Sequence, residues 1–134
     1  MQVLMVEDFE PYRQFVKSSL AKMDGLQIAV SEATDGLQAV DQARELKPSL
    51  ILLDIGLPKL SGIEAARQIL AALPESKIIF LTQETSHDVM REALSLGAYG
   101  YVIKSRAATD LIPAVQAALD GKRFIGAGLA AHDL

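Results

Sequence analysis

Residues 47–63 read KPSLILLDIGLPKLSGI, and this stretch decides the fold. Four aliphatic residues, 50–53, lead directly into Asp54 without the apolar–polar alternation of a strand that has one wet face. The run is therefore predicted to be a central parallel strand that is covered on both faces. Because a buried carboxylate is costly without a partner, the charge of Asp54 must be met by groups from other parts of the chain.

Short apolar runs alternate with helical patterns along the rest of the chain. Strands are predicted at residues 3–6, 78–81 and 101–103, with the alternating run 27–33 as an edge strand. Apolar residues at i, i+3 and i+4 spacing predict helices over residues 12–23, 36–47, 61–73 and 86–96, and a fifth that stops at Gly121. Pro113 requires this fifth helix either to begin near Thr109 or to have distorted first turns. Five strand–helix repeats predict an α/β fold, a parallel sheet with helices on both faces.

The composition predicts one compact domain over residues 1–121, followed by a tail or linker over residues 122–134. The chain has 134 residues, half of them apolar, a net charge of −4 and no cysteine. The sequence contains no block of Lys and Arg for a phosphate backbone, so we expect no direct contact with nucleic acid. No apolar run approaches the roughly 20 residues that span a bilayer, and the lack of cysteine fits a reducing compartment, so we expect a cytoplasmic location without membrane contact.

Polar residues follow the predicted strands at the point where each strand ends. Glu7 and Asp8 follow the first strand, Asp54 the third, Thr82 ends the fourth and Lys104 follows the fifth. Ligands of such sheets bind beyond the carboxyl ends of the strands. If the first and third strands are neighbours, like charges about 4 Å apart cost about 4 kcal/mol per pair at an effective dielectric of about 20. Either strongly raised pKa values or a cation must relieve this repulsion, and carboxylate oxygens suit Mg²⁺ and phosphoryl chemistry.

These motifs, in this order, resemble the receiver domain of two-component response regulators over residues 2–121. The matching stretches are Glu7-Asp8, DIGLPKLSG at 54–62, Thr82 at the end of IIFLT, and GAYGYVIK at 97–104. The DIGLP form and the later GKRFI resemble the NarL/FixJ (LuxR-type) subfamily, whose members carry a helix-turn-helix output domain that this sequence does not contain. The resemblance implies a flavodoxin-like, doubly wound five-stranded sheet in the order 2-1-3-4-5 with five helices.

The resemblance also assigns roles to individual residues. Asp54 is expected to accept a phosphoryl group from a histidine kinase or a histidine phosphotransfer protein. Mg²⁺ is expected to bind Asp8, Asp54 and the backbone carbonyl of Gly56, with Glu7 reached through water. Thr82 and Lys104 are expected to bind the phosphoryl group, and Thr82 with Tyr101 to form the switch. The implied protein is a signalling module that controls transcription and dimerises on phosphorylation, and its catalysis is limited to its own phosphorylation and dephosphorylation.

Two positions depart from the family pattern. Ser105 follows Lys104 where many receivers have proline, and a cis peptide there would cost about 3 kcal/mol more than a trans peptide. Gln83 follows Thr82 where a small residue is usual, so its side chain is expected to modulate access to the phosphoryl site.

Other readings of the sequence remain open. A phosphatase of the haloacid dehalogenase type also uses a strand-end aspartate and Mg²⁺, but it needs a second acid two residues later, where this chain has Gly56. A pseudo-receiver that binds partners without phosphorylation is a further alternative. The chain is interpreted as the receiver of a longer transcription regulator, with a free-standing receiver as the alternative.

Overall fold

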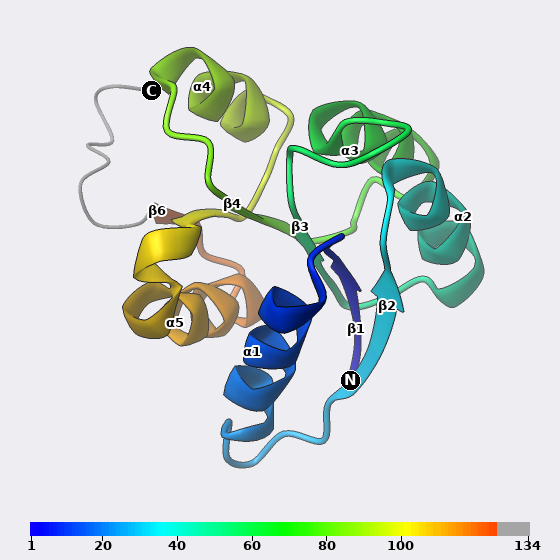
Figure 1. Cartoon of the computed structure of the whole chain (residues 1–134). Coiled ribbons are helices and arrows are strands. Elements are labelled where there is room, and N and C mark those ends of the chain that lie inside the picture. The colour runs from blue at the N-terminus through cyan, green and yellow to red at the C-terminus, as the bar shows by residue number, and fades with distance from the viewer. Residues whose placement is uncertain (126–134) are drawn as a thin grey trace.

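The computed structural model describes residues 1–125, which form a three-layered α/β structure (Figure 1). One parallel sheet has the strand order β2-β1-β3-β4-β5-β6. The strands are β1 Gln2–Val6, β2 Ala29–Ala33, β3 Leu50–Leu53, β4 Ile78–Thr82, β5 Gly100–Ile103 and β6 Phe124–Ile125. The helices are α1 Glu10–Ala21, α2 Gly36–Leu46, α3 Gly62–Ala72, α4 His87–Ser95 and α5 Ala107–Leu119, with a 3₁₀ turn, η1 Lys104–Arg106, before α5.

The predicted order of the first five strands is confirmed, but the prediction of a five-stranded sheet is wrong. A sixth strand, β6, lies beside β5 and pairs Gly100 with Phe124 and Tyr101 with Ile125. The backbone N–H of Phe124 also donates to the carbonyl of Tyr99 at 2.9 Å. Two residues are too few to show strand periodicity, and the pairing uses backbone atoms that every residue type carries. The segment predicted as a tail therefore begins within the sheet, and its residues 126–134 lie outside the described part of the chain.

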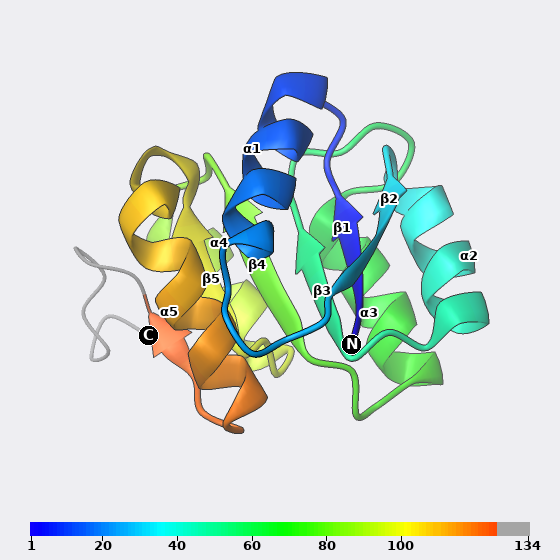
Figure 2. The same ribbon diagram turned by 90° about the horizontal axis from the view of Figure 1, so that it is seen from below.

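The two faces of the sheet are covered by different helices. The helices α2, α3 and α4 pack on one face, and α1 and α5 lie together on the other (Figures 1 and 2). Every residue of β3 and β4 is buried, as expected for central strands without alternation. The alternating segment forms β2 at the edge of the sheet, where Glu32 reaches solvent and Ala33 is buried.

The helix boundaries follow local capping signals. Asp35, Ser61 and Ser86 accept hydrogen bonds at the starts of α2, α3 and α4 from the backbone N–H groups of Gln38, Glu64 and Val89. The three helices begin and end within one residue of the predicted bounds.

The fifth helix resolves the alternative that Pro113 raised. It starts at Ala107 rather than near Thr109, and the residues directly before it form the 3₁₀ turn η1 instead of α-helix. Pro113 lies inside the helix, where it has no N–H to offer the carbonyl of Thr109. Both residues are exposed, so water can satisfy that carbonyl.

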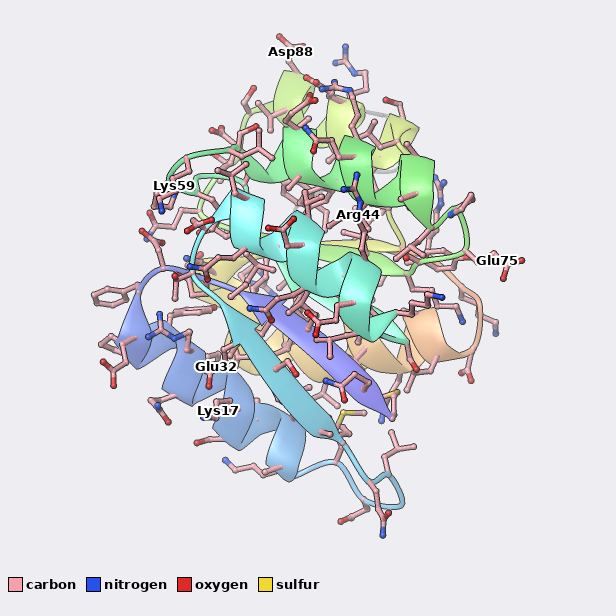
Figure 3. The ribbon with its side chains drawn as sticks, turned by 90° about the vertical axis from the view of Figure 1, so that its right-hand side faces the viewer. Lys17, Glu32, Arg44, Lys59, Glu75 and Asp88 are labelled. Carbon is pink, nitrogen blue, oxygen red and sulfur yellow. The ribbon has the colours of Figure 1, made fainter. Side chains whose placement is uncertain are left out.

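The loops form two groups, one at the carboxyl ends and one at the amino ends of the strands. Lys59, in the loop after β3, and Glu75, in the loop before β4, lie at opposite ends of the molecule (Figure 3). Glu7, Asp8, Asp54, Thr82 and Lys104 all lie at or directly after the carboxyl ends of strands. In residues 1–125 the structure contains no helix with the length and apolar character of a membrane span.

Candidate functional site

The register of the sheet brings the acids of β1 and β3 together. Val6 pairs with Leu53, so Glu7 and Asp54 leave adjacent strands at the same level. Ligand oxygens of Glu7, Asp8 and Asp54 all lie within 4.8 Å of one another. Glu7 and Asp54 are buried, whereas Asp8 is exposed. The predicted convergence of the three carboxylates is therefore present in the structure.

Both carboxylate oxygens of Asp54 have partners. Its Oδ1 accepts the backbone N–H of Ile55 at 2.7 Å and, more weakly, that of Gly56 at 3.4 Å. Its Oδ2 lies 2.9 Å from Nζ of Lys104. The charge at the end of β3 is thus met by the next turn of the backbone and by Lys104, the first residue of η1, 50 residues away.

Gly62 allows the loop after Asp54 to close. Its N–H donates to the carbonyl of Ile55 at 2.7 Å. A Cβ at residue 62 would lie 1.9 Å from the carbonyl oxygen of Asp54 and 2.7 Å from Cα of Ile55. The first residue of α3 therefore has to be glycine for the helix to pack directly on the backbone that carries Asp54.

Glu7 shares Lys104 with Asp54. Its Oε1 lies 2.5 Å from Nζ of Lys104, and its Oε2 accepts the N–H of Phe9 at 3.0 Å. Burial raises the pKa of Glu7 above its usual value, and the contacts with Lys104 and Phe9 only partly oppose this effect. Burial acts against the charge of Lys104 as well, but hydrogen bonds to Glu7 and Asp54 outweigh it, so the pKa of Lys104 is raised. Two acids stabilise the charge of Lys104, whereas Glu7 and Asp54 have, within residues 1–125, only this one lysine between them to stabilise their charges.

The charges of the cluster fit a divalent cation. The three carboxyl groups and the one ammonium group of Lys104 have a formal excess of two negative charges. The donors are hard oxygen atoms, and the exposed Asp8 leaves one side open to water, as Mg²⁺ prefers. The residues present therefore fit the predicted magnesium site.

Thr82 and Tyr101 meet at the backbone of Glu84. The hydroxyl of Thr82 accepts the N–H of Glu84 at 3.3 Å, and the hydroxyl of Tyr101 donates to the carbonyl of Glu84 at 2.8 Å. The side chain of Tyr101 is fully buried, and burial raises its pKa, with smaller effects from the charges of Glu84 and Asp54. The sequence indicated both side chains of the predicted switch but not Glu84, because its backbone makes the contacts.

A cavity of about 650 Å³ opens over the acids. Its wall contains the acids, Lys104, Gly56 and Gln83, but Thr82 is 2% exposed and is not part of it. Residues that sequence reasoning did not assign to the site also line the cavity: Phe9, Tyr12, Thr85, Ile103 and Ser105. The peptide between Lys104 and Ser105 is trans.

Tyr12 and Arg13 are the main additions to the predicted site. Arg13 donates to the carbonyl of Glu7 at 3.0 Å and pairs with Glu32 of β2 at 3.2 Å. The ring of Tyr12 faces the ammonium group of Lys104. Burial, together with the charges of Glu7 and Asp54, raises the pKa of Tyr12 to about 12. The apolar spacing of α1 had assigned Tyr12 to the core, and no local pattern indicates its contact with Lys104 of η1.

Fold and site together define a doubly wound α/β protein with an acidic strand-end pocket closed by a lysine. Residues 3–116 match the family model described as "Response regulator receiver domain". The chain therefore belongs to the response regulator receiver domain family.

Relatives agree with this assignment. The response regulator GacA of Pseudomonas viridiflava is 32% identical over 130 residues, which are 97% of this chain and 60% of that protein. The response regulator VraR of Staphylococcus epidermidis is 33% identical over 122 residues, 91% of this chain and 58% of that protein. The chain thus spans about 60% of the length of these relatives.

Solved structures give the same result. A LuxR-family two-component response regulator from Aurantimonas sp. SI85-9A1 has a TM-score of 0.85 at 29% identity, and the match covers 92% of this chain and 87% of that one. The isolated receiver domain of RcsB from Salmonella enterica serovar Typhimurium, solved with the phosphomimetic BeF3−, has a TM-score of 0.87 at 25% identity, covering 95% and 94%. The predicted resemblance to LuxR-type receivers is confirmed.

Proposed function

We propose that this chain is a Mg²⁺-dependent phosphorylation switch in which Asp54 is the phosphoacceptor. The observation that carries the proposal is the position of Asp54, whose Oδ2 lies in the acidic cluster at 2.9 Å from Lys104. A carboxylate there can attack a phosphorus atom that enters through the cavity. The donor is the phosphohistidine of a histidine kinase or a histidine phosphotransfer protein.

The transfer forms one bond and breaks another. An oxygen of Asp54 bonds to phosphorus as the P–N bond to the donor imidazole breaks, and the electron pair returns to that nitrogen, which takes up a proton. Asp8, Asp54 and the carbonyl of Gly56 would hold Mg²⁺, with Glu7 reached through water. When bound, the ion supplies charge neutralisation for the phosphoryl oxygens. Lys104 supplies a further positive charge, and Gln83 in the cavity wall limits access.

The change at Asp54 reaches the surface through Glu84. Thr82 turns its hydroxyl toward the phosphoryl group, which releases the N–H of Glu84, and Tyr101 holds the carbonyl of the same residue. The side chain of Glu84 accepts the N–H of Ser86, the N-cap of α4, at 2.9 Å. Movement at residue 84 is therefore transmitted to the start of α4 and to β5.

The cellular role follows from the relatives and stays a proposal. DegU of Brevibacillus brevis is named a transcriptional regulatory protein, and it is 31% identical over 125 residues, 52% of its length. We expect residues 1–121 to act as the receiver of such a cytoplasmic regulator, to dimerise on phosphorylation, and to leave DNA contact to an output domain. Membership of the receiver family and Gly56 argue against the haloacid dehalogenase alternative, while the pseudo-receiver alternative is decided by experiment.

The test is phosphorylation of the chain by acetyl phosphate with Mg²⁺, followed by intact mass. We expect the mass of one phosphoryl group to be gained by the wild type and by Asp110→Asn, and to be absent from Asp54→Asn. Asp110 is a matched control because it is also buried, but in α5 and paired with Arg106. A wild type that gains no mass with saturating Mg²⁺ would favour the pseudo-receiver, and steady release of phosphate from esters would favour the phosphatase.

A further inference from the structure

Tyr12 touches both ends of Lys104. Its ring centroid lies 4.8 Å from Nζ of the lysine. Its hydroxyl donates to the backbone carbonyl of the same lysine at 3.1 Å, across 92 residues of sequence. A contact at one end only would be a common packing event, whereas two contacts to one residue fix both its backbone and its charged group.

We propose that Tyr12 is the positioning residue for Lys104, which it holds in the cavity above Asp54. This inference rests on the proposed function, because it assigns to Tyr12 the placement of the cation that binds the phosphoryl group. The contacting atoms are the π face of the ring, which attracts the ammonium group, and the phenolic hydroxyl, which anchors the start of η1.

The lysine needs such a partner because its side chain is a flexible stem that ends in a point charge. Glu7 and Asp54 attract the ammonium group from the acidic side, and Tyr12 contacts it as well. The carbonyl of Lys104 also accepts the N–H of Ala107, the first residue of α5. The hydroxyl of Tyr12 is therefore a second donor on a carbonyl at the junction of β5 and α5.

Tyr12 is itself held in place. Its backbone N–H donates to the carbonyl of Phe9 at 3.1 Å, and its ring lies 5.3 Å from that of Phe15, centroid to centroid. A partly buried ring on a helix positions Lys104 better than an exposed side chain would, because the ring loses little conformational entropy when the ligand binds. The ring of Tyr12 stays in position while the ammonium group of Lys104 exchanges its hydrogen bond to Asp54 for one to a phosphoryl oxygen.

The functional test compares fluoroberyllate affinity, with Mg²⁺ at saturation, in Tyr12→Phe, Tyr12→Leu and wild type. Tyr12→Phe keeps the ring and loses one neutral hydrogen bond, so we expect binding to weaken about 3-fold. Tyr12→Leu loses the ring as well, so we expect a weakening of about 10-fold. Tyr99→Leu is the matched control, because it removes a ring that lies 5.6 Å from Lys77 and outside the cavity.

A second measurement reports the geometry without any ligand. The Hε protons of Lys104 should be shifted upfield by the ring current in wild type and Tyr12→Phe, and this shift should be absent from Tyr12→Leu. Equal Hε shifts in all three proteins, or equal fluoroberyllate affinities in a responsive wild type and Tyr12→Leu, would overturn the role of Tyr12. A wild type that binds no fluoroberyllate refutes the proposed function instead, so the two failures are distinguishable.

Discussion

Replacing Gly62 with alanine is expected to displace the backbone of Asp54. The added Cβ would lie 1.9 Å from the carbonyl oxygen of Asp54, where real Cβ contacts essentially never fall below 3.0 Å. Helix α3 or the loop after β3 must therefore move by at least 1.1 Å, the difference between these two distances. The obstructing atoms belong to the backbone, so no side-chain rotation relieves the clash.

Two magnitudes follow from this displacement. Overpacking of a close contact costs about 1–3 kcal/mol of the free energy of unfolding. A misplacement of about 1 Å at a reacting group reduces the rate about 100-fold. We therefore expect Gly62→Ala to fold with reduced stability and to be phosphorylated by acetyl phosphate about 100-fold more slowly than wild type.

Gly36→Ala is the control that separates an effect of lower stability from an effect of displacing Asp54. A Cβ at residue 36 would meet the carbonyl oxygen of Leu60 at 2.0 Å, a comparable clash that does not involve Asp54. Urea unfolding gives the stability of both variants, and mass spectrometry gives their phosphorylation rates. The reasoning is refuted if Gly62→Ala keeps the wild-type rate, or if Gly36→Ala, at similar stability, loses as much of its rate.

Two further predictions concern the acidic pocket and the switch. Asp8→Asn should weaken Mg²⁺ binding roughly tenfold or more with little change in the urea midpoint, because Asp8 is the exposed acid of the cluster that would hold the ion. Calorimetric titration measures this, and Asp88→Asn, whose side chain is 90% exposed on α4, should bind Mg²⁺ as wild type does. Burial raises the pKa of Tyr101, so the folded state keeps a proton that the unfolded state loses above pH of about 10. The stability that this burial confers is present below that pH and is lost as the pH rises further. Tyr101→Phe should therefore show a smaller fall in stability above this pH in urea titrations, and an identical fall would contradict the assignment.

The sequence predicted the meeting of Glu7, Asp54 and Lys104 because parallel strands leave little freedom. Each residue directly follows a strand, and parallel strands in neighbouring positions end at one edge of the sheet. Runs such as residues 50–53 and 78–81 are apolar throughout, so their central position was readable from residue type alone. The convergence of charge therefore depends on the strand order, which the resemblance to receiver domains implied.

The parts that sequence reasoning missed are held by backbone atoms or by contacts between distant segments. Strand β6 pairs through the backbone of Phe124, and Glu84 contacts Thr82 and Tyr101 through its own N–H and carbonyl. Such contacts leave no residue-type signal. Tyr12 had an apolar position in a helix, and only the packing of α1 and α5 on the same face of the sheet brings it to Lys104.

The direction of the proposed switch follows from a comparison of hydrogen bonds at Thr82. Its hydroxyl now accepts the N–H of Glu84 at a long distance of 3.3 Å, and a neutral bond contributes about 0.5–1.5 kcal/mol at best. A phosphoryl group on Asp54 carries a charge of about −1.5 to −2, and a hydrogen bond from the same hydroxyl to this anion is roughly twice as strong. We therefore expect Thr82 to turn toward the anion when it forms. We expect the N–H of Glu84 then to be released, while its carbonyl stays bonded to Tyr101 and its side chain stays bonded to the N–H of Ser86, so that the backbone at residue 84 can move away from Thr82.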